Sequence, residues 1–128
     1  MKPDIKGLTK LAQRIRRVPK KQFSIEEWLV KKPHCGTAGC IAGWASIIFP
    51  HRFRKVRSFV SESSNVTDYY IEHRSSGLGD EYGFAKGFNI SEEDARELVL
   101  EDFKTKRTPK KAADAIMELV TKLKKWGL

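Results

Sequence analysis

A glycine-rich run at residues 35–45 constrains the fold more than any other segment of this chain. It reads Cys-Gly-Thr-Ala-Gly-Cys-Ile-Ala-Gly-Trp-Ala. Thr37 is a suitable N-cap for a helix that Pro50 ends. Glycine in a helix costs about 1 kcal/mol relative to alanine. Gly39 and Gly43, four residues apart on one helix face, therefore predict close packing against another element. The structural motif comprises Cys35, Gly36, Thr37, Cys40, Gly43 and Trp44.

Two further helices are predicted before this motif. Residues 4–18 carry apolar side chains at helical spacing, and Pro19 ends the pattern. Ser24 opens a capping box, because a glutamate follows three positions later. The box predicts a short helix through Trp28-Leu29-Val30.

The C-terminal part of the chain has the clearest helix signals. Residues 80–87 form a short helix at most, since glycines at 83 and 87 interrupt them. Ser91 is an N-cap, followed by three acidic residues that suit the first turn of a helix. Thr108 and Pro109 open the last helix, whose apolar stripe ends at Trp126.

Residues 51–79 are the least regular part of the sequence. Segments 56–60 and 66–71 are rich in β-branched and aromatic residues, which favours a two-stranded hairpin. A structureless insertion fits the imperfect alternation equally well. With 128 residues, the chain has the length of one domain. The predicted fold is mainly α, a compact helical single domain over 1–128 with an irregular or short β-hairpin insertion near 51–79.

The glycine-rich run also carries a resemblance. It is similar to the Cys-Gly-Thr-x-x-Cys-x-Ala-Gly-Trp segment of small uncharacterised proteins of phages, prophages and bacteria. The similarity extends to the aromatic helix at 23–28, the segment at 87–95 and the final helix at 108–113. It implies a shared fold and a phage-like origin, and it implies no catalytic residues.

The charges of the chain are unevenly placed. Its net charge is +9, yet residues 62–102 hold eleven acidic residues against three basic ones. If folding keeps these segments apart, one surface attracts polyanions and another repels them. The opening Met1-Lys2-Pro3-Asp4 is not typical of a signal peptide, and there is no apolar run near 18 residues. We therefore expect a cytoplasmic protein.

Two chemical alternatives depend on the cysteines. Cys35 and Cys40, with His34, His51 or His73, offer ligands that zinc prefers, but their spacing differs from that of structural zinc motifs. A nucleophilic Cys35 before a helix would need a histidine base. His34 is a poor base for it, because side chains of sequence neighbours in a loop point to opposite sides. We therefore expect no metal, no cofactor and no enzymatic activity, and a cysteine- or zinc-dependent enzyme is a distant alternative.

Nucleic-acid binding is the leading functional hypothesis. Arginines alternate with phenylalanines between residues 51 and 59, a composition that suits phosphate contacts and base stacking. Basic residues also cover one face of the first helix. The candidate residues are Arg14, Arg16, Arg17, Arg52, Phe53, Arg54, Lys55 and Arg57.

The partner could be nucleic acid, a host nucleoprotein, or a host protein complex that the chain inhibits. The three tryptophans, Trp28, Trp44 and Trp126, take inward positions of their predicted helices. The sequence therefore offers no exposed aromatic anchor for a protein partner.

Overall fold

A computed structural model of the chain describes residues 2–19, 29–32, 36–39, 41–61, 66–99 and 108–126. The helices are α1 (Ile5–Arg16), α2 (Ile41–Ile48), α3 (Asp80–Phe88), α4 (Glu92–Val99) and α5 (Pro109–Trp126). The strands are β1 (Leu29–Lys32), β2 (Gly36–Gly39), β3 (Phe53–Ser61) and β4 (Val66–His73). The prediction of a mainly helical fold with a hairpin between 51 and 79 is confirmed.

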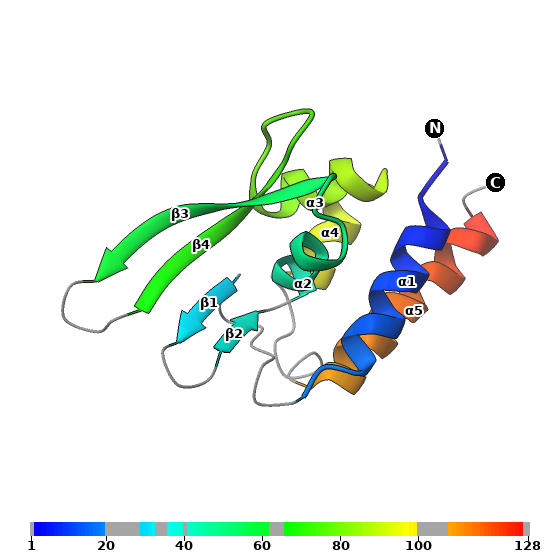
Figure 1. The fold of residues 1–128 in the computed structure, drawn as a ribbon. Helices are drawn as coiled ribbons and strands as arrows, with labels where there is room; N and C mark the ends of the chain where they lie inside the picture. Colours follow the sequence, from blue (N-terminus) through cyan, green and yellow to red (C-terminus); the bar gives the residue numbers. More distant parts are fainter. Residues whose placement is uncertain are drawn as a thin grey trace.

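Helices α1 and α5 lie side by side, so that the start of α1 and the end of α5 meet at one end of the molecule (Figure 1). Buried Leu8, Leu11 and Ile15 of α1 and buried Ile116 and Val120 of α5 belong to one hydrophobic core. Both helices also have the caps that fix their starts. The Gly7 N–H donates to Asp4 Oδ1 (2.9 Å), and the Lys111 N–H donates to Thr108 Oγ1 (3.2 Å).

The sheet is antiparallel, with strand order β2-β1-β4-β3. The β3–β4 hairpin extends away from the helices, with β1 beside β4 (Figure 1). Its register runs from Phe53 opposite His73 to Ser61 opposite Val66, with an irregularity between Arg57 and Phe59. The structure thus selects the hairpin over the structureless insertion.

The short helix predicted through Trp28-Leu29-Val30 was wrong for its described residues. Leu29 and Val30 belong to β1, which pairs with β2 on one side and β4 on the other. An isolated helix of about seven residues is marginal in water. Strand pairing satisfies the backbone groups of this segment on both sides, which the local capping signal does not predict.

The N-cap role predicted for Thr37 was also wrong. Residues 36–39 form β2, with Thr37 opposite Lys31, and α2 begins only at Ile41. Gly39 therefore does not share a helix face with Gly43. Gly43 is buried in α2 as the motif predicted, and Trp44 packs against the core. Cys35 and Cys40 lie outside the described residues.

Helix α3 continues through the two glycines that were expected to interrupt it. A Cβ at Gly83 would collide with the Leu78 carbonyl oxygen, and a Cβ at Gly87 would lie 2.5 Å from Phe53 Cε1. The two glycines lower the helix propensity, but they let α3 approach the Leu78 carbonyl and the Phe53 ring. Close packing therefore outweighs helix propensity in α3. The helix ends at Asn89, which has φ 58° and caps it in the left-handed conformation.

Candidate nucleic-acid interface

Four exposed cations form a line along α1. Lys6, Lys10, Arg14 and Arg17 follow one another at intervals of four, four and three residues, so they share one helix face. We call this line the basic stripe. It lies on the opposite side of α1 from buried Leu8, and at 1.5 Å per residue it is about 16 Å long. That length matches about five phosphate steps along one strand of duplex DNA.

Arg16 is not part of the basic stripe. Its Nη2 forms an ion pair with Asp114 Oδ1 of α5 at 2.9 Å. Both side chains are about half exposed, so the pair adds little stability, but it directs the guanidinium toward α5. The structure therefore separates Arg16 from Arg14 and Arg17, which the sequence had grouped together.

The turn between α2 and β3 lies beside the basic stripe. Lys10 Nζ is 5.4 Å from the centre of the Phe49 ring, and Arg52 Cζ is 4.6 Å from the same centre. Both cations are within the range of a cation–π contact. Two basic segments that are about 40 residues apart in the sequence thus meet at Phe49 and form one surface.

Arg52 holds this surface together. Its Nη1 is 2.7 Å from Asp4 Oδ2, and its guanidinium also lies over the Phe88 ring, 5.2 Å from the centre. The backbone N–H of Asp4 donates to the Phe88 carbonyl at 2.9 Å. Arg52 therefore joins the start of α1 to the end of α3, and its charge is already balanced by Asp4.

Phe53 and Phe59 were the two candidates for stacking on a base, and Phe53 is not available for it because it lies in the core. The side chain of Phe59 lies outside what the structure describes. The Phe53 side chain is 1 % exposed, and its ring stacks on Phe84 at a centroid distance of 6.4 Å and meets Phe88 at 5.5 Å. The inward direction follows from the first position of β3, where the strand leaves the helical core. The neighbouring Arg54 consequently points outward.

A shallow hollow of about 290 Å³ lies next to the turn, lined by Ser46, Ile47, Pro50, Phe53, Arg54, Lys55 and Arg74. Arg54 Nε donates to Glu72 Oε1 at 2.9 Å, and Arg74 Nε donates to the Pro50 carbonyl at 2.8 Å. The lining of the hollow therefore combines apolar and cationic residues, and one of its cations, Arg54, is paired with Glu72. Arg57 lies further along β3, opposite Tyr69.

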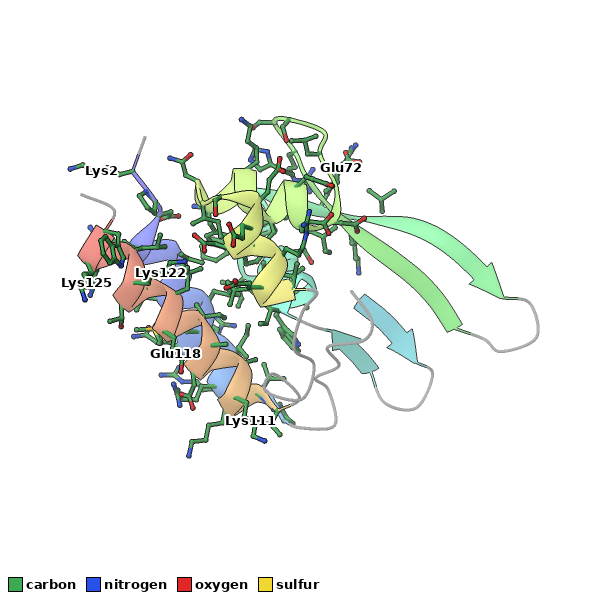
Figure 2. All side chains as sticks on the ribbon, turned by 180° about the vertical axis from the view of Figure 1, so that it is seen from behind. Lys2, Glu72, Lys111, Glu118, Lys122 and Lys125 are labelled. Carbon is green, nitrogen blue, oxygen red and sulfur yellow. The ribbon has the colours of Figure 1, made fainter. Side chains whose placement is uncertain are left out.

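The acidic residues are only partly segregated from the basic ones. Helices α1 and α2 face the viewer in Figure 1, whereas α4 and α5 face the viewer in Figure 2. Helix α4, which has three acidic residues in its first turn, thus lies on the opposite side of the molecule from α1 and α2. Two acidic residues of the segment 62–102, however, pair with cations. Glu72 pairs with Arg54, and Asp94 pairs with Lys122 Nζ at 2.9 Å. This last contact raises the pKa of Lys122, mainly through its hydrogen bond to Asp94.

The residues of the zinc and thiol alternatives are not gathered in the described part of the chain. Within these residues, no three histidine, cysteine, aspartate or glutamate side chains are placed to hold a metal ion. His51 is exposed on the turn. His73 Nδ1 is 2.8 Å from Ser76 Oγ in the loop after β4. Cys35, Cys40 and His34 lie outside the described residues.

His73 makes stability depend on pH. Burial lowers its pKa below the ordinary value of 6.5, and the charges of Arg52 and Lys86 lower it further. The folded state thus favours neutral His73, whose Nδ1 accepts the Ser76 N–H at 3.3 Å. Just below pH 6.5, His73 is protonated more often in the unfolded chain than in the folded protein. The free energy of unfolding should therefore fall as the pH drops below 6.5.

The expected result is a lower melting temperature for the wild type at pH 5 than at pH 7.5, with a smaller decrease in His73→Asn. Asparagine keeps an acceptor near the position of Nδ1 but does not titrate. Thermal unfolding of both proteins across this range measures the difference. Parallel decreases would show that His73 does not contribute to the pH dependence.

Comparisons of the chain with protein-family models, with curated proteins and with solved structures found no match. None of the helices in the described ranges combines the length and the apolar character that crossing a membrane requires.

Proposed function

We propose that this chain is a non-enzymatic binding protein of phage-like type, directed by charge to nucleic acid or to a nucleoprotein complex. The observation that supports it best is the meeting of the basic stripe with the α2–β3 turn at Phe49. Four exposed cations on one face form a surface suited to phosphates, and Arg52 meets this surface at Phe49. The resemblance of the glycine-rich run supports the phage-like origin.

Binding through this surface would mainly concern the nucleic-acid backbone. Lysine and arginine contacts to phosphates position a protein but do not read sequence. A helix-turn-helix protein would present a polar recognition helix after a short turn. Helix α2, which follows α1, is instead largely buried and apolar. The proposed binding is therefore nonspecific in sequence and strongly dependent on salt.

The test is a variant in which Lys6, Lys10, Arg14 and Arg17 are all replaced by alanine. Each lost duplex phosphate contact reduces the slope of log affinity against log salt by about 0.9, so four contacts reduce it by about 3.6. Fluorescence anisotropy with a labelled duplex at several salt concentrations measures both slopes. The matched control is Arg16→Ala, which removes one cation from the same helix but not from the stripe. Equal slopes for the wild type and the fourfold variant would contradict the proposal.

The alternative is an inhibitor or anti-defence module that docks on a host protein complex. Leu78 and Tyr82 favour it, because both are large apolar residues and each is 42 % exposed. A capture experiment from host lysate with and without nuclease separates the two functions. Partners that survive nuclease treatment support the protein-docking function, whereas partners that are lost support binding through nucleic acid.

A further inference from the structure

Trp126 is far more exposed than a tryptophan in a predicted inward stripe should be. It is 74 % exposed, against 40–42 % for the other exposed large apolar side chains of the described residues. The stripe prediction holds as far as Leu123, which still packs against the core. After Leu123 the helix is no longer covered, since Lys124, Lys125 and Trp126 are all exposed. The inward position predicted for Trp126 was therefore wrong.

Among the described residues, Lys125 is the cation that contacts Trp126, with Nζ 5.6 Å from the centre of the indole ring. Lys124 is also exposed, but two positions along the helix it points to the other side of α5. Lys2 lies at the same end of the molecule as Lys125 (Figure 2). A single exposed apolar residue is common and needs no explanation. An exposed indole with lysines at the same end of the molecule is a narrower combination, because it offers a stacking surface together with countercharges for phosphates.

We propose that Trp126 stacks on an unpaired base of single-stranded nucleic acid, while Lys125 and Lys2 contact the adjoining phosphates. The inference rests on the proposed function and names its substrate class. Proteins that bind single strands combine a basic surface with aromatic side chains on which bases stack. The faces of the bases in a duplex are covered by their neighbours, so only the basic contacts remain available there. Trp126 would thus take the stacking role that the sequence pattern suggested for Phe53 or Phe59.

The experiment compares a single-stranded oligothymidine with a duplex of equal length, using the wild type, Trp126→Ala and Trp126→Phe. Base stacking on an aromatic side chain is worth a factor of about 5 to 150 in affinity. Trp126→Ala should weaken single-strand binding within that range and leave duplex affinity unchanged. Trp126→Phe should keep part of the single-strand affinity, since a smaller ring remains. Oligothymidine should quench part of the intrinsic tryptophan fluorescence of the wild type. This quenching should largely disappear in both variants, because they lack Trp126.

Tyr82→Ala is the control, because it removes another exposed aromatic side chain, which lies on α3 with a single lysine, Lys86, one turn later. It should change neither affinity. Equal single-strand affinity of the wild type and Trp126→Ala would overturn the inference, as would an equal loss on both ligands. If the basic-stripe variant still lowers duplex affinity in that case, the proposed function stands. Absence of salt-sensitive binding to either ligand would overturn both.

Discussion

Replacing Phe53 by alanine is expected to lower the free energy of unfolding by about 3–5 kcal/mol, the usual cost of deleting a fully buried aromatic side chain. The ring is 1 % exposed and contacts Phe84, Phe88 and the His73 ring, at 6.0 Å from the last. Its loss leaves a cavity between β3 and α3 that the surrounding backbone closes only in part. Urea unfolding followed by circular dichroism measures the change.

Ile47→Ala is the control for this prediction. Ile47 belongs to α2 near the same turn but is 40 % exposed, so its truncation should cost much less. The folded Phe53→Ala protein should also show the same slope of log affinity against log salt for nucleic acid as the wild type. A Phe53→Ala protein as stable as the wild type would contradict this prediction.

Replacing Gly87 by alanine should destabilise the protein by about 3 kcal/mol, the upper end of the usual cost of overpacking a core. The added Cβ would lie 2.5 Å from Phe53 Cε1, and still closer to Cζ, so the buried ring or the helix has to move. This cost arises although alanine favours helices by about 1 kcal/mol over glycine. Urea unfolding again measures the change.

A second substitution makes this prediction specific. Leucine at position 53 lacks the ring atoms that the new Cβ would meet, so Gly87→Ala combined with Phe53→Leu should lose less stability than the two single changes add up to. Contacting residues commonly show such coupling, at 0.5–3 kcal/mol. Strict additivity, or a Gly87→Ala protein as stable as the wild type, would show that the glycine is not required by the ring.

The local signals in the sequence determined the helices with strong caps and long apolar stripes. Asp4 precedes α1, Ser91 Oγ accepts the Asp94 N–H at 3.0 Å, and Pro109 starts α5. A cap and a 3.6-residue apolar period act within a few residues, so they can be identified from a single sequence. The hairpin position was predicted for the same reason, since β-branched segments flank a polar turn.

Only the tertiary structure decided the elements whose partners are distant in the chain. β1 depends on β4, nearly 40 residues later, and its pairing overrides a local helix signal at Leu29 and Val30. The glycines of α3 were predicted as breaks, but their meaning depends on the Phe53 ring and on the Leu78 carbonyl. Strand pairing and close packing are long-range contacts, which residue types alone do not specify.

The candidate interface, too, was predicted in part from the sequence and decided in part by the tertiary structure. The spacing of basic residues along α1 was evident in the sequence, and so was the cluster after Pro50. Which of these cations remain available was decided by partners far along the chain: Asp114 pairs with Arg16, and Asp4 with Arg52. The burial of Phe53 and the exposure of Trp126 have a similar cause. A helical or strand pattern determines which side chains share a face, but only the assembled core determines where that face is covered.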